Sequence, residues 1–230
     1  MNFEPYHKFS ACRKLEERIV ALNDAGAVPA ALYAEHERYH FSLLHKLRSA
    51  RYHVDTLSSF LRSGTAQSMA PIDLVYRVNF HFDGFLHVVG SATDIFAREV
   101  LTYFGIPLPN RVYYKTAEEQ LTIHRSGDAF ITRLQAPSWK QEFSNYRNTS
   151  THERLIGTQY SISVQTQGHS FTQRVVVPVP DDPRSAVPTF ENNPDIVDYC
   201  CKTFKRVVSH FNQAYSDLDS RVKSAGCLPL

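Results

Sequence analysis

Residues 145–155, NYRNTSTHERL, concentrate groups that could do chemistry in one short span. Arg147 is followed by the amide of Asn148, by three hydroxyl residues and by His152. An arginine offers a forked set of donors that matches a phosphate, and an imidazole gains and loses a proton near neutral pH. The segment therefore predicts a site that binds a phosphate-like anion and transfers a proton beside it.

The backbone between these two residues decides whether they can share one ligand. In a continuous α-helix, residues five positions apart point about 140° away from each other. Residues 148–151 are poor helix formers, and Ser150 and Glu153 have the spacing of a capping box. We predict that one helix ends near Arg147 and that a short turn starts after Ser150, which places His152 at an anion-binding helix N-terminus. Alternatively, a second subunit supplies the partner group.

The run Arg147-Asn148-Thr-Ser-Thr-His152 resembles the R-x(4–6)-H motif of the HEPN superfamily, in which a polar residue commonly follows the arginine. The resemblance implies an all-helical bundle that forms a homodimer and brings two motifs together. It also implies a metal-independent endoribonuclease without a cofactor, of the kind found in toxin–antitoxin and antiviral defence systems. RNA is then the expected partner, and an antitoxin or a nucleotidyltransferase is a possible partner protein.

The resemblance also implies a role for each residue of the motif. His152 acts as general base or acid, Arg147 neutralises the phosphate in the transition state, and Asn148 orients one of them. The nucleophile is the 2′-hydroxyl of the RNA, so the products are a 2′,3′-cyclic phosphate and a 5′-hydroxyl. Ser150 and Asp94 are candidates for supporting this site from outside.

Two other interpretations of the motif stay open. A catalytically inactive HEPN-like module would bind RNA, a nucleotide or a protein with the same residues. In the simplest alternative, Arg147 and His152 are ordinary solvated side chains near a helix end, and Arg147 forms a weak surface ion pair with Glu142 or Glu153.

A second motif is the literal HExxH match at residues 36–40, HERYH. On a helix it places two histidines one turn apart, as in a zinc peptidase with Glu37 as general base. Against this function, Arg38 puts a positive charge between the ligands, no Gly-x-x-His follows, and His36 falls on an apolar helix face. A third ligand from the next long helix, such as His81, His87 or Asp94, stays open. We expect no metal site here.

Apolar spacing predicts the elements that position these motifs. Steps of three and four predict long helices over residues 7–24, 29–62 and 72–104, with a loop from Ser63 to Pro71. Shorter helices are predicted near residues 114–121, 128–134 and 139–147. Alternation predicts a β-hairpin at about 159–179, and Asn193 and Pro194 have the pattern of a helix start. The predicted fold is mainly α, an antiparallel helical bundle of long helices with a small β-hairpin insertion, in a single domain over residues 1–230.

The composition sets the class of protein. The chain has 230 residues, of which 43% are hydrophobic and 12% aromatic, enough for a large core, and its net charge of +2 is far from that of a dedicated duplex-DNA binder. Its four cysteines form no CxxC pair, and no apolar segment predicts a signal peptide or a membrane span. We therefore expect a cytoplasmic protein without membrane contact, in which Cys200 packs as a small hydrophobic side chain rather than acting as a nucleophile.

Overall fold

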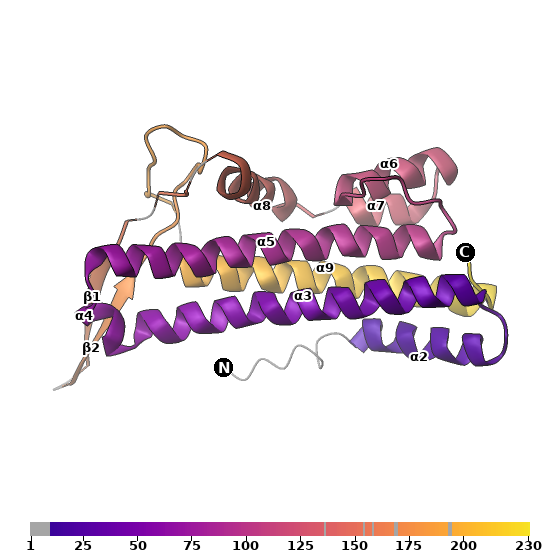
Figure 1. The fold of residues 1–230 in the computed structure, drawn as a ribbon, viewed down its shortest axis with the longest axis horizontal. Coiled ribbons are helices and arrows are strands. Elements are labelled where there is room, and N and C mark those ends of the chain that lie inside the picture. The colour runs from indigo at the N-terminus through magenta and orange to yellow at the C-terminus, as the bar shows by residue number, and fades with distance from the viewer. Residues whose placement is uncertain (1–9, 136, 154, 158, 168–169, 193–194) are drawn as a thin grey trace. The chain divides into compact units, whose positions relative to one another are not determined.

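In a computed structural model, the chain folds as a mainly α-helical bundle with a small antiparallel β-hairpin (Figure 1). The structure describes residues 10–135, 137–153, 155–157, 159–167, 170–192 and 195–230. Its elements are α2 (Ser10–Asp24), α3 (Ala30–Arg62), α4 (Gly64–Ser68), α5 (Pro71–Tyr103), α6 (Tyr114–His124), α7 (Ala129–Gln135), α8 (Trp139–Asn148), the π-helical turn η1 (Thr149–Glu153), β1 (Ser161–Gln167), β2 (Ser170–Val176) and α9 (Ile196–Ala225). The predicted fold class is confirmed.

The two longest helices follow the apolar stripes of the sequence closely. The observed bounds of α3 and α5 differ from the predicted 29–62 and 72–104 by one residue at most at each end. Pro71 takes the first position of α5, where its fixed φ suits a helix start. Gly105 follows the helix with a φ of 63°, a backbone conformation that residues with a side chain rarely adopt, and it ends the helix.

Smaller features differ from the expectation or extend it. The sequence predicts a loop from Ser63 to Pro71, but Gly64–Ser68 form the short helix α4. The predicted helix start at Asn193 and Pro194 lies outside the described residues. The next residue, Asp195, caps α9, because one carboxylate oxygen accepts a hydrogen bond from the backbone N–H of Val197 at 2.9 Å.

The hairpin falls within the predicted span of about 159–179. Its strands pair in register from Ser161 opposite Val176 to Gln167 opposite Ser170. Residues 168–169, between the two strands, lie outside the described residues.

The chain divides into two compact units. Unit one comprises Met1–Arg48, Ser91–Ser138 and Lys205–Leu230, and unit two comprises Ser49–Gly90 and Trp139–Phe204. The single-domain organisation of residues 1–230 stays a prediction, and each unit is described by itself below.

In unit one, α3 and α5 run antiparallel. His36 contacts Tyr103, and His40, one turn further along α3, contacts Glu99, one turn earlier on α5. This is the side-by-side arrangement that the heptad-like stripes predict.

In the same unit, α9 runs parallel to α5. Phe96 stacks on Phe211 with ring centroids 4.4 Å apart, and Glu99 accepts a hydrogen bond from Tyr215, so both numbers rise together along the contact. A parallel neighbour is possible because about ninety residues separate the end of α5 from the start of α9.

In unit two, aromatic packing fixes α8. The ring of Tyr146 lies 6.2 Å from that of Phe82 on α5 and 4.8 Å from that of Tyr199 on α9. The Tyr146 hydroxyl donates a hydrogen bond to the carbonyl oxygen of Pro180. The residue that precedes Arg147 in the sequence is therefore anchored on three sides, which gives the following motif a defined starting point.

Candidate functional site

The helix carrying the predicted motif changes its geometry between the two key residues. The α-helical part ends at Asn148, and the chain continues directly into the π-helical turn Thr149–Glu153. Single π-helical turns are rare and often occur at functional sites. Their i→i+5 hydrogen bonds widen the turn, so residues five positions apart are expected to differ less in direction than the 140° of an α-helix.

One detail of the expected break is wrong. His152 lies within the π-helical turn and not at the N-terminus of a new helix, because the backbone widens here instead of stopping. Ser150 does not act as a helix cap. Its hydroxyl donates a hydrogen bond to the Asp83 carboxylate at 2.6 Å. His152 therefore does not lie beside the free backbone N–H groups of a helix N-terminus, which would bind an anion.

Gly90 of α5 has no side chain, so the Arg147 side chain packs closely against the helix at this position. A Cβ atom added at Gly90 would lie 2.6 Å from the Nε atom of Arg147 and 3.0 Å from its Cδ atom. Real Cβ contacts are not this short, so any larger residue at position 90 would displace the arginine. The glycine thus provides the close approach that fixes where the guanidinium can reach.

Asp83 is a second contact between α5 and the motif. The side chain is half-buried, and this burial raises the pKa of its carboxyl above 3.8, although the hydrogen bond from Ser150 acts in the opposite direction. Carboxyls with a raised pKa are characteristic of functional sites, since they can hold a proton nearer neutral pH.

These contacts fall on one stripe of α5. Asp83, His87 and Gly90 are spaced by four and three residues, so they follow one another along a helix face. Ser150 binds the first of them, Arg147 packs on the last, and the exposed His87 lies between. The stripe adds a second imidazole to the same face.

Exposure separates the members of the motif. Arg147 is half-buried, whereas Asn148 and His152 are exposed. Within unit two, the imidazole is thus open to a ligand or to another chain, while the arginine is held against α5.

The predicted supporting residue Asp94 belongs to unit one. Its carboxylate accepts a hydrogen bond from the backbone N–H of Tyr114 at 3.2 Å, where α6 begins. This contact gives Asp94 a structural role at a helix start. Its role in supporting the motif stays a prediction.

Unit one contains a second cluster, built on the HExxH segment. His36 and His40 of α3 and Glu99 of α5 are all buried, and their ligand atoms lie within 4.8 Å of one another. The Nδ1 atom of His40 lies 3.0 Å from Oε1 of Glu99, and that of His36 lies 3.6 Å from the same oxygen. We call these three residues the buried triad.

Four neighbouring side chains complete the surroundings of the buried triad. The Tyr103 hydroxyl donates to Oε1 of Glu99 at 2.6 Å and lies 2.8 Å from Nδ1 of His36, and Tyr215 donates to the other carboxylate oxygen. On the far side of the His40 ring, Nε2 lies 3.6 Å from the sulfur of Cys12 and 3.6 Å from a carboxylate oxygen of Glu16.

Charge is balanced inside this cluster. Burial acts to raise the pKa of Glu99, but the hydrogen bonds and charges of His36 and His40 lower it below its usual value. Burial acts to lower the pKa of His40, but its contacts with Cys12 and Glu99 raise it to about 11. Without a bound ion, the interior therefore holds a carboxylate facing an imidazolium.

The HExxH segment is not arranged as in a zinc peptidase, because its glutamate and its histidines lie on different sides of the helix. Glu37 and Arg38 are exposed, so the general base of that mechanism is turned toward solvent and away from the buried histidines. The third donor beside the histidines is Glu99, which was not among the candidates His81, His87 and Asp94. The sequence signal for this contact is Glu99 itself, a carboxylate three residues after Phe96 on the apolar face of the helix.

Comparisons of the chain with protein-family models, curated proteins and solved structures found no match. Within the described residues, no helix is long and apolar enough to cross a membrane.

Proposed function

We propose that this protein is a HEPN-like, metal-independent endoribonuclease that uses Arg147, Asn148 and His152. The observation that carries the proposal is the π-helical turn Thr149–Glu153, which starts between the arginine and the histidine. Such a turn reduces the angle expected between residues five positions apart. Gly90 and Asp83 of α5 hold this turn through Arg147 and Ser150.

The chemistry requires few groups, because RNA contains its own nucleophile. The 2′-oxygen attacks the adjacent phosphorus while the bond to the 5′-oxygen breaks. His152 accepts the 2′-hydroxyl proton, and a second imidazole protonates the leaving 5′-oxygen. Arg147 stabilises the additional negative charge on the phosphate oxygens, and Asn148 orients the phosphate. The products are a 2′,3′-cyclic phosphate and a 5′-hydroxyl.

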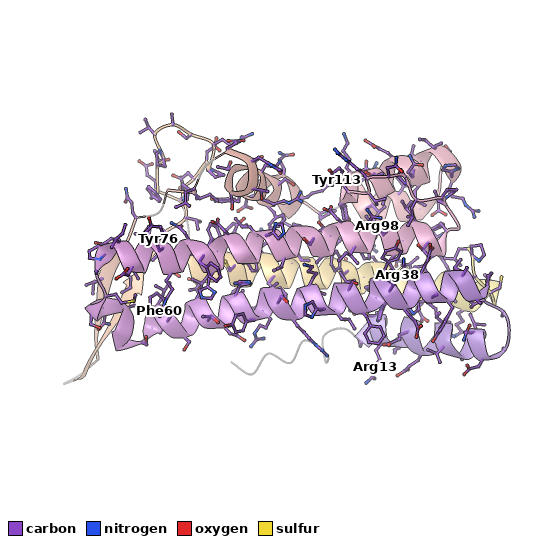
Figure 2. The ribbon with its side chains drawn as sticks, viewed as in Figure 1. Arg13, Arg38, Phe60, Tyr76, Arg98 and Tyr113 are labelled. Atoms are coloured by element: carbon purple, nitrogen blue, oxygen red, sulfur yellow. The ribbon has the colours of Figure 1, made fainter. Side chains whose placement is uncertain are left out.

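A second copy of the chain is the proposed source of the second imidazole. Ile72, Tyr76 and Phe80 of α5 are spaced by four residues and are 59%, 66% and 69% exposed; Figure 2 labels Tyr76. Such an apolar row on a surface is characteristic of a protein interface. It lies in the unit that contains the motif, which supports a homodimer with two motifs in one composite site.

The proposal is tested with labelled RNA and purified protein in EDTA. We expect cleavage with cyclic-phosphate ends, and we expect Arg147→Ala and His152→Ala each to lower its rate by roughly 10²–10⁴-fold while the protein stays folded. Arg13→Ala and His124→Ala are the matched controls, since both positions are exposed and lie in unit one. Full cleavage by both motif variants would remove this site from consideration.

Mixing the two inactive variants tests the composite site. A mixed dimer of Arg147→Ala and His152→Ala contains one intact Arg147 and one intact His152. Regained activity would therefore show a shared site in which a single His152 is sufficient, with His87 as the second imidazole, whereas the mixture stays inactive if both copies of His152 are needed. RNA binding without cleavage by the unmodified protein would instead support the inactive HEPN-like binding module. An antitoxin or nucleotidyltransferase partner, and a cytoplasmic location, are parts of the same proposal.

A further inference from the structure

We propose that the buried triad of His36, His40 and Glu99 binds a divalent transition-metal ion such as Zn²⁺ in the interior of unit one. This site is separate from the proposed ribonuclease site, which needs no metal. The ion would connect α3 to α5 in the centre of the unit.

The donor set and its spacing suit such an ion. Two imidazole nitrogens and a carboxylate oxygen form a common ligand set for zinc and for iron(II). With metal–ligand bonds of about 2.0–2.1 Å, tetrahedral ligands lie about 3.3 Å from one another. The Nδ1 atoms of His40 and His36 lie 3.0 Å and 3.6 Å from Oε1 of Glu99, on either side of that value.

The backbone sets these positions firmly. His36 and His40 are one helical turn apart on α3 and thus point to the same side. Glu99 comes from the antiparallel helix α5 at the level of His40. Ligands on facing helices of a bundle are a frequent design for interior metal sites.

The groups around the triad match what metal ligands require in a second layer. A ligating histidine normally uses its other ring nitrogen for a hydrogen bond. Nε2 of His40 has Cys12 and Glu16 within 3.6 Å for this purpose, and the second oxygen of Glu99 accepts a hydrogen bond from Tyr215. The Tyr103 hydroxyl, which contacts both Glu99 and His36, is the available fourth donor.

Burial indicates what the ion would do. Structural zinc sites are closed, whereas catalytic sites keep a position open to substrate. All three ligands and Tyr103 are buried, and the exposed Glu37 cannot serve as a base for a bound water. The site is therefore a structural one, and the ion stabilises the packing of α3 on α5.

The proposal is tested by measuring the metal content of the full chain, purified without chelator, by mass spectrometry. We expect close to one equivalent of zinc, iron or another divalent transition metal per chain. After removal of the metal, added Zn²⁺ should raise the melting temperature, and Co²⁺ should give the visible absorption of a four-coordinate ion. A metal-free protein whose melting temperature does not respond to Zn²⁺ would show that a proton, and no ion, occupies the triad.

A conservative variant and a matched control assign the ion to this site. Glu99→Gln keeps the size of the side chain but removes its charge, and it should weaken Zn²⁺ binding at least tenfold. His53→Gln is the control, because His53 also faces another histidine, His81, with their Nδ1 atoms 3.2 Å apart, but lies in unit two. Loss of metal in the control with retention in Glu99→Gln would place the ion elsewhere and overturn the assignment. If Glu99→Gln does not fold, Cys12→Ser, which alters only the second layer, should reduce the affinity to a smaller extent, and an unchanged affinity would count against the site.

Discussion

The buried triad of unit one and the exposed motif of unit two both combine histidine with a charged residue. They differ in that the charges of the triad are enclosed by other side chains, whereas the histidine of the motif faces solvent. Glu99 is surrounded by two histidines and two tyrosine hydroxyls within the same unit. His152, in contrast, is exposed on a π-helical turn. A charge in the interior must be balanced by the chain itself or by an ion, whereas an exposed group stays available to a ligand.

The histidines of the two units show the same contrast. Contacts with Glu99 and Cys12 raise the pKa of His40 in unit one, so this ring carries a proton when no metal is bound. In unit two, burial lowers the pKa of His53 and of His81, which favours the neutral form of both rings. Burial alone thus favours the neutral form of an imidazole, and a facing carboxylate reverses that preference in His40.

The largest effect is expected from Glu99→Ala. It leaves a buried imidazolium without its carboxylate and should lower the free energy of unfolding by about 3–5 kcal/mol in chelator-treated protein, measured by urea denaturation. Glu17→Ala is the control, because its pair with Arg13 is exposed, and it should leave the unfolding curve unchanged. Equal stability of both variants would show that the buried charge is not held by the triad.

Introducing charge into the exposed row tests whether unit two depends on a second copy. The double variant Tyr76→Lys, Phe80→Lys should be monomeric by light scattering and should cleave RNA at least tenfold more slowly, because like charges would meet across the interface. Phe41→Lys is the control, since Phe41 is 65% exposed but lies in unit one. A monomeric double variant with full activity would contradict the composite site and leave His87 as the second imidazole.

Gly90→Ala tests whether α5 positions Arg147. The added methyl group would displace the arginine, so we expect a loss of about 1–3 kcal/mol of stability together with slower RNA cleavage. Gly157→Ala is the matched control in unit two, because its nearest neighbour would be 3.9 Å away. Unchanged cleavage in Gly90→Ala would mean that the guanidinium does not depend on this contact.

The smallest effect is expected from mild acid acting on His53 and His81. Their folded-state pKa values are lowered below 6.5, so the unfolded chain binds protons first as the pH falls. Their contribution to stability is therefore complete above the unfolded pKa and is lost as the pH falls from 7 toward 5. Urea denaturation at several pH values should show a shallower loss in His53→Gln than in the unmodified protein, and identical slopes would argue against neutral rings.

Much of the architecture could be predicted from local patterns. Steps of three and four in α3 and α5 gave their bounds within a residue, because burial of one helix face requires that periodicity. The poor helix formers after Asn148 predicted a change in the backbone at the position where the π-helical turn begins. Which residues of α5 meet this turn could not be predicted, since Asp83 and Gly90 are distant in sequence from Ser150 and Arg147.

The sequence by itself determined a mainly helical protein, the segments that form its long helices, and the residues 147–152 as a place where the helix changes. Only the tertiary structure decided that Glu99 faces His36 and His40, because that contact depends on how α3 and α5 align along their length. An apolar stripe on one helix indicates that another helix packs against it. The level at which two stripes meet is set by the packing of all side chains between them, and no short motif records it.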